Sequence, residues 1–159
     1  MSKIKKAPSI LQHKAGGFPG ASHKKAYFLY EILEKLEVGI ELTGTEVKSV
    51  YAGDLNFSDA WVSIEKGEAW LEHFHIGTWE HASINNHIPL RRRRLLLHKR
   101  EIVRWEKKEK GLTIVPLAIY SKNQFIKIEI GLARGKKEYD KRETIKKREA
   151  DRDISREMK

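Results

Sequence analysis

The sequence lacks cysteine, so disulfide scaffolds and thiolate metal sites are excluded. Its longest uncharged apolar run, LTIVPLAIY at residues 112–120, is far shorter than the roughly 20 residues that a membrane-spanning helix needs. The N-terminus is basic but has no apolar core of the kind found in secretory signals. Glycine-rich phosphate loops of the Walker and dinucleotide types and the G-x-S-x-G motif are also absent. We therefore expect a cytoplasmic protein that is not an enzyme, with one domain and extensions.

What the sequence does have is charge, and that charge is unevenly placed. The formal net charge of the 159 residues is +10. Residues 1–25 carry six lysines and no acidic residue, whereas residues 26–90 carry three basic and eleven acidic residues. Residues 91–110 carry ten basic and three acidic residues, and residues 135–159 carry ten basic and seven acidic residues. Such segregation favours a polyanion bound along particular edges of the molecule, with a solvated basic surface as the simpler alternative.

Hydrophobic periodicity predicts mainly extended structure in the first half. Residues 28–42 alternate between apolar and charged positions, which is typical of a half-buried strand, although a helix competes over part of the same segment. Thr45 fits the N-cap of a short helix that ends at Gly53. WVSIEKGEAWLEHFHI, at residues 61–76, contains two alternating runs joined at KG, which predicts a hairpin.

The second half predicts one helix and two strands. LRRRRLLLHKREIVRWEKKEKG, which follows Pro89, has an apolar stripe at helical spacing and ends at Gly111. Arginines in the first turns of that helix would oppose its dipole, so we expect them to bind an anion from outside. Residues 112–133 predict two apolar strands around SKNQ, and Pro116 implies an edge or a bulge in the first of them.

These elements predict a mainly β protein with helices. The expected architecture is an OB-type antiparallel β-barrel with a flanking amphipathic helix, a short helix and a disordered C-terminal tail. The predicted boundaries are a flexible basic N-terminal arm at 1–22, an RNA-binding barrel at 23–134 and a basic tail at 135–159.

Histidines offer a weak alternative to RNA binding. His73 and His75 lie two residues apart on a predicted strand and would face the same way. A zinc site needs three or four converging ligands, so surface or packed histidines are the better interpretation. We expect no metal and no cofactor.

The chain from about residue 22 to the C-terminus resembles the tmRNA-binding small protein B (SmpB, SsrA-binding protein) family. The resemblance rests on ordered segments that include EVGIELTGTEVKSV, RRRRLLLHKREI and FIKIEIGLARGKKEYDKR. It implies an OB-type barrel that binds the tRNA-like domain of transfer-messenger RNA (tmRNA, SsrA RNA). With that RNA, members of the family enter ribosomes stalled on messages without a stop codon and serve trans-translation, without being enzymes.

The resemblance also implies which residues contact RNA. The tmRNA-binding residues would be Glu37, Lys48, Leu96, His98 and Lys127. Apart from the resemblance, the basic runs themselves predict supporting RNA contacts from Lys24, Lys25, Arg91, Arg92 and Arg94. The ribosome-binding tail, in the decoding site and the empty message channel, would comprise Gly135, Lys136, Lys137, Tyr139, Asp140, Lys141 and Arg142.

The implied partners are tmRNA, the 30S ribosomal subunit with its ribosomal RNA and, indirectly, elongation factor Tu with alanylated tmRNA, but no membrane. We expect the tail to be disordered in the free protein and helical on the ribosome, because its opposite-charge pairs contribute only about 0.2–0.5 kcal/mol each. A general ribosome-associated RNA chaperone or ribosomal protein is the second hypothesis. A histidine-metal nuclease is a distant third.

Overall fold

A computed structural model describes residues 18, 20–82, 85–108 and 110–158. Most of the predicted N-terminal arm therefore lies outside the described residues. Along the chain the elements are β1 (Ala21–Ser22), α1 (Lys24–Leu29), β2 (Tyr30–Ile40), α2 (Gly44–Tyr51), β3 (Leu55–Asn56), β4 (Trp61–Glu65), β5 (Glu68–Glu72), β6 (His75–Ile76), β7 (Arg93–Leu96), α3 (Lys99–Lys108), β8 (Thr113–Lys122), β9 (Phe125–Gly135) and α4 (Glu138–Glu157).

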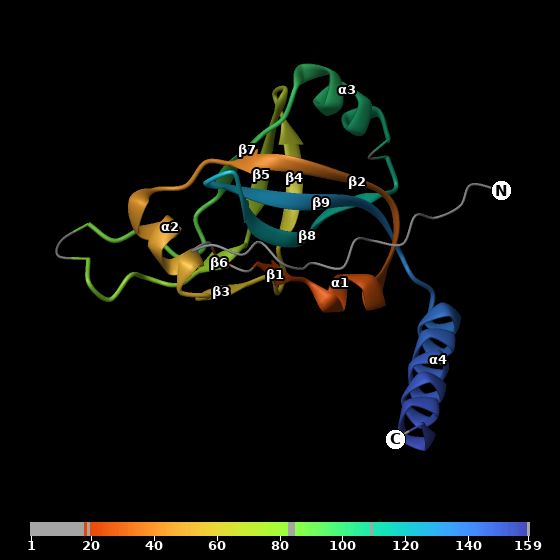
Figure 1. Cartoon of the computed structure of the whole chain (residues 1–159). Coiled ribbons are helices and arrows are strands. Elements are labelled where there is room, and N and C mark those ends of the chain that lie inside the picture. The colour runs from red at the N-terminus through yellow and green to blue at the C-terminus, as the bar shows by residue number, and fades with distance from the viewer. Residues whose placement is uncertain (1–17, 19, 83–84, 109, 159) are drawn as a thin grey trace.

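Antiparallel strands form the body of the molecule. Seven of them hydrogen-bond in the order β1-β8-β4-β5-β7-β2-β9, and β8 also pairs with β9, so the strands close into a ring. β3 and β6 form a separate two-stranded sheet. Figure 1 shows α2 at one end of the ring, α3 on another side and α4 projecting away from the body. The prediction of a mainly β chain with several helices is confirmed.

The core lies inside the ring. The inward residues of the strands include Leu71, Ile119 and Ile128, which are fully buried. Trp105 of α3 joins the same apolar cluster and is also fully buried. Because the inner face is filled by apolar side chains, polar side chains on the ring strands mostly lie on the outer face.

Several local predictions are confirmed. β2 covers most of the predicted strand, although α1, which was not predicted, precedes it. β4 and β5 form a hairpin that turns at residues 66–67, and β8 and β9 form one that turns at residues 123–124. The pairing of β8 with β9 shifts register between Pro116 and Ala118, which is the bulge that proline implied.

The helix predicted to follow Pro89 is wrong in its first part. Arg93–Leu96 form β7, and α3 begins only at Lys99. Along β7 the side chains alternate between buried Arg93 and Leu95 and exposed Arg94 and Leu96, which is the period of a strand. β7 pairs with β5 on one side and β2 on the other, so the stretch is needed to close the ring.

Two further expectations are wrong in detail. The short helix α2 has its N-cap at Thr43, because the Thr43 side chain and Glu46 form a capping box that Thr45 cannot form. β5 ends at Glu72, and His73 has a φ of 53°, so His73 and His75 do not lie on one continuous strand.

The tail forms α4, and none of the residues Glu138–Glu157 is buried. A helix of this length without tertiary burial has little to stabilise it. That the free tail is disordered stays a prediction.

Candidate nucleic-acid interface

A row of paired residues crosses four strands on the outer face of the ring. Leu96 of β7 pairs with Gly39 of β2, Gly39 pairs with Lys127 of β9, and Lys127 pairs with Tyr120 of β8. Directly paired residues point to the same face of a sheet, so Leu96, Lys127 and Tyr120 share the outer face. Leu96 is 52% exposed and lies over Gly39, where an added Cβ would be 3.2 Å from the Leu96 side chain. The ring thus brings together residues that are far apart in the sequence.

Glu37 lies on the same face, two residues before Gly39 on β2. Its carboxylate accepts a hydrogen bond from the Tyr120 hydroxyl at Oε2 and one of 2.9 Å from Lys122 Nζ at Oε1. Burial favours the neutral acid, but these two hydrogen bonds and the charges of Lys122 and Lys127 outweigh it and lower the pKa of Glu37. Glu37 is therefore an ionised carboxylate with fixed neighbours at neutral pH.

Tyr120 remains a hydrogen-bond donor. Burial and the hydrogen bond to Glu37 both raise the pKa of the Tyr120 hydroxyl. A raised pKa keeps the proton on the phenol, so the hydroxyl can donate to the carboxylate at all physiological pH values.

His98 and Lys48 are both exposed and lie on elements next to these strands. His98 directly precedes α3, and its carbonyl oxygen accepts a hydrogen bond of 3.1 Å from the backbone N–H of Ile102. His98 lies two residues beyond Leu96 in the chain. Lys48 is exposed on α2, and Tyr51, one turn further on, has its hydroxyl 3.4 Å from Ser121 Oγ of β8. α2 therefore packs beside the strand that carries Tyr120.

Arg91 is occupied within the molecule. Its guanidinium donates to both oxygens of Glu46, at 2.7 and 2.6 Å. Glu46 is fully buried, and it also accepts a bond of 2.7 Å from the equally buried Arg93. The helix-dipole argument does not apply to Arg91, whose guanidinium belongs to a structural network, and an RNA contact by Arg91 stays a prediction.

Arg94 of β7 and Arg92, just before β7, are both exposed, but each has a carboxylate beside it. Arg92 lies 2.9 Å from Glu72 and its guanidinium stacks over the Trp70 ring, 4.5 Å from the centroid. Arg94 lies 3.0 Å from Glu68. An RNA contact by either arginine stays a prediction, and it would compete with these ion pairs.

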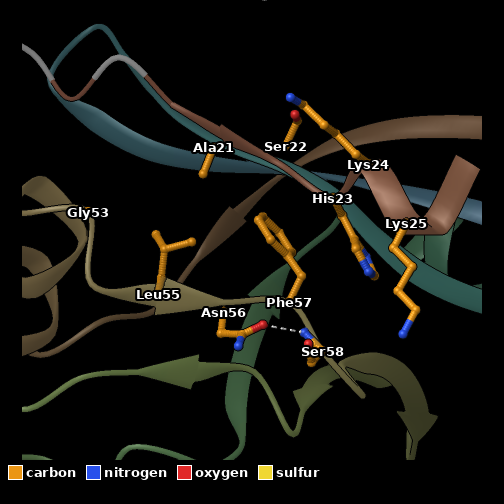
Figure 2. Close-up of a pocket in the computed structure, with 10 residues that line it drawn as sticks. All are labelled: Ala21, Ser22, His23, Lys24, Lys25, Gly53, Leu55, Asn56, Phe57 and Ser58. Carbon is orange, nitrogen blue, oxygen red and sulfur yellow. Dashed lines mark hydrogen bonds between the residues drawn. The ribbon is translucent and has the colours of Figure 1, made fainter.

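Lys24 and Lys25 line a separate pocket between the start of α1 and the segment around β3 (Figure 2). His23 anchors this region, because its ring stacks on Phe57 with centroids 5.2 Å apart and its Nδ1 lies 3.0 Å from the Pro116 carbonyl oxygen. Figure 2 shows the two lysine side chains extending in different directions from the helix start. They do not belong to the group around Glu37.

The tail residues lie at the opposite end of β9 from Lys127. Gly135 pairs with Tyr30 at the start of β2, and the backbone N–H of Lys136 donates to the Leu29 carbonyl at 2.9 Å. Lys137 is the N-cap of α4. Tyr139 is 69% exposed. The remaining predicted tail residues, Asp140, Lys141 and Arg142, follow within the first two turns of α4.

The hydrogen-bond partners of Glu37 and of the arginines were not predicted from the sequence. Tyr120 and Lys122 support Glu37, and Glu46 binds the arginines, yet none of the three was predicted in that role. RRRRLL does not alternate between polar and apolar residues, so no local pattern indicated that Arg93 points inward with Leu95. Nothing in the sequence indicated which carboxylate would meet it.

The described residues hold no group of three or more His, Cys, Asp or Glu placed to bind a metal ion. Nor is any helix among the described residues both long and apolar enough to cross a membrane.

The chain is similar to known proteins over most of its length. The model of a protein family described as "SmpB protein" matches residues 20–159. An SsrA-binding protein of Carboxydothermus hydrogenoformans is 52% identical over 141 residues, covering 87% of this chain and 95% of the relative. One from Streptococcus mutans is 52% identical over 148 residues, covering 92% and 96%. A solved chain from "tmRNA-SmpB: a journey to the center of the bacterial ribosome" superposes with a TM-score of 0.65 at 46% identity, covering 76% of this chain and 86% of that one.

Proposed function

The chain belongs to the SmpB protein family, and on this premise we propose that it binds the tRNA-like domain of tmRNA and delivers it to stalled ribosomes. In this proposal it is a cytoplasmic adaptor for trans-translation rather than an enzyme, and alanylated tmRNA reaches the ribosome with elongation factor Tu. The proposal includes an OB-type barrel, since such barrels present one outer face to nucleic acid.

The observation that carries the proposal is the outer face that unites Glu37, Leu96 and Lys127. Folded RNA with unpaired loops is recognised through phosphates, base edges, stacking and the 2′-hydroxyl. On this face Lys127 supplies a cation for a phosphate, Leu96 an exposed apolar surface for a base or ribose, and Glu37 an acceptor for an RNA donor. His98, two residues beyond Leu96, and Lys48 of α2 would add further contacts.

The tail serves the ribosome in this proposal. α4 buries none of its residues Glu138–Glu157 against the barrel, so the segment is free to enter another structure. Gly135, at the end of β9, begins it, and Tyr139 to Arg142 would contact small-subunit RNA at the decoding site and in the empty message channel. An RNA channel would supply the contacts that hold this charged helix.

Removal of residues 139–159 tests this division of labour. We expect tmRNA affinity to be nearly unchanged in a gel shift, because the outer face around Glu37 is intact, whereas peptide tagging on stalled ribosomes should be abolished. Ile154→Ala in the full chain is the matched control, since it changes an exposed tail residue outside the 135–142 segment. Loss of tmRNA binding on truncation would contradict the proposal.

A competition arm separates the adaptor from a general RNA chaperone. The adaptor should retain labelled tmRNA against an excess of bulk RNA, because the outer face recognises one folded shape. Equal displacement by both competitors would favour the chaperone.

A further inference from the structure

Glu37 lies opposite another carboxylate, which is electrostatically unfavourable. It pairs directly with Glu129 across β2 and β9, and like charges opposite each other repel. Glu129 is partly neutralised by Lys35, whose Nζ lies 3.5 Å from its carboxylate. Without support of its own, the Glu37 side chain would move away from Glu129 and sample several rotamers.

Tyr120 provides that support from a third strand. It lies on β8 beside Lys127, and its hydroxyl reaches past β9 to Oε2 of Glu37. Lys122, two residues further along β8, donates to Oε1 at 2.9 Å. Each carboxylate oxygen thus accepts one bond from β8, and a carboxylate has about four acceptor positions. The Glu37 side chain is still 37% exposed, so acceptor positions face outward.

We propose that Tyr120 is a positioning residue for RNA recognition, whose hydroxyl holds the Glu37 carboxylate in one orientation to receive a hydrogen-bond donor of the RNA. The inference rests on the proposed function, because it concerns how Glu37 performs its part in it. Lys122 shares the task and offsets the negative charge that would otherwise repel nearby phosphates. The aromatic ring has only two rotatable bonds, so it fixes the carboxylate more firmly than a flexible side chain could.

The first arm of the test uses the protein without RNA. Tyr120→Phe removes only the hydroxyl. Tyr51→Phe is the matched control, because it removes from α2 a hydroxyl that lies 3.4 Å from Ser121 Oγ on β8. A carboxyl-detected NMR titration should show the pKa of Glu37 rising in Tyr120→Phe and unchanged in Tyr51→Phe. The charged groups that face Glu37 stay in place in both variants, namely Lys35, Lys122, Lys127 and Glu129. An unchanged pKa of Glu37 in Tyr120→Phe would overturn the inference.

The second arm measures tmRNA affinity in a double-mutant cycle. Tyr120→Phe should weaken binding by about three- to tenfold, the usual effect of one lost hydrogen bond, with unchanged circular dichroism. In a Glu37→Ala background the same change should have no further effect, because the carboxylate that Tyr120 positions is gone. Equal weakening in both backgrounds would mean that Tyr120 contacts RNA directly and would overturn the positioning role.

The two arms separate failure of the inference from failure of the proposed function. If Glu37→Ala binds tmRNA as tightly as the unmodified chain, the RNA role of the cluster is overturned even when the titration behaves as expected. If the unmodified chain itself does not bind tmRNA, the proposed function fails, while the titration still reports whether Tyr120 holds Glu37.

Discussion

Glu46 connects α2 to β7 through a single buried carboxylate. It accepts hydrogen bonds from the guanidinium groups of Arg91 and Arg93 and from the backbone N–H of Thr43 at 2.8 Å. Arg93 is equally buried and also donates to the carbonyl oxygens of Phe74 and Pro89. Desolvating such a pair is costly, so its net contribution to stability is small, but removing one partner leaves the other charge buried and uncompensated.

We predict that Glu46→Ala lowers the free energy of unfolding by about 3–5 kcal/mol, the usual cost of breaking a buried ion pair from one side. Urea denaturation followed by tryptophan fluorescence measures this change. Glu65→Ala is the control, because its side chain is 56% exposed beside Arg92, and such surface pairs contribute roughly 0–1 kcal/mol. Equal effects of the two substitutions would refute the network's structural role.

The role of Glu46 can also be tested through the pH dependence of the free energy of unfolding. Burial alone would raise the pKa of Glu46, but the hydrogen bonds from Arg91 and Thr43 and the charge of Arg93 lower it below the ordinary value of 4.5. A carboxyl with a lowered folded-state pKa stabilises the fold above its unfolded pKa, and this contribution is lost as pH falls through the folded value. The unmodified chain should therefore lose stability below about pH 4.5, and Glu46→Ala should lose less over the same range.

At the scale of residues, the sequence predicted which residues are candidates for the site better than it predicted which side chains they contact. The basic run and the candidate residues of the outer face could be named from the sequence and its resemblance to a family. Their partners could not, because Glu46 is 47 positions from Arg93 and Glu37 is 83 from Tyr120. Only the closed ring of strands decides which of the many carboxylates meets which cation.

At the scale of elements, turn residues and polar/apolar alternation predicted the strands reliably. KG and NQ join strands whose alternating residues fill the core, so both hairpins were predictable. β7 was not, because its four residues, RRLL, do not alternate between polar and apolar, and only two residues separate them from α3. Its strand geometry is imposed by hydrogen bonding to β5 and β2, which no local pattern reports.

The two hairpin turns differ in one informative respect. In both turns, both residues have a positive φ. The second residue of the first turn is Gly67, whereas that of the second turn is Gln124, a residue with a Cβ and a φ of 66°. The left-handed conformation costs a non-glycine residue roughly 1–2 kcal/mol. Asn-Gly is the preferred sequence for such a two-residue turn.

We predict that Gln124→Gly raises the free energy of unfolding by about 0.5–1 kcal/mol, since relief of strain exceeds the extra backbone entropy of glycine. Thermal and urea denaturation measure the gain. Gln124→Ala keeps the Cβ, and therefore the strain, so it should show no comparable stabilisation. A gain of equal size in both variants would mean that the glutamine side chain, rather than its backbone conformation, is unfavourable.

At the scale of the whole molecule, folding redistributes the charge that the sequence displays. The acidic segment at residues 26–90 supplies the carboxylates, among them Glu46, Glu68 and Glu72, that lie against the arginines of the basic segment. Ion pairs between neighbouring elements therefore neutralise part of the charge contrast between these two segments. We therefore expect the conspicuous arginine run to contribute less to RNA binding than Lys127, which lies on the outer face beside Tyr120.

This difference between neutralised and available cations predicts how salt affects tmRNA binding. The logarithm of the association constant should fall linearly with the logarithm of salt concentration between about 50 and 200 mM. Lys127→Ala should reduce the slope by about 1, because one phosphate contact is lost. Glu37→Gln should weaken binding without reducing the slope, because a carboxylate that accepts from RNA displaces no cation from a phosphate. Fluorescence anisotropy of labelled tmRNA measures both slopes, and equal slopes for Lys127→Ala and the unmodified chain would mean that Lys127 does not contact a phosphate.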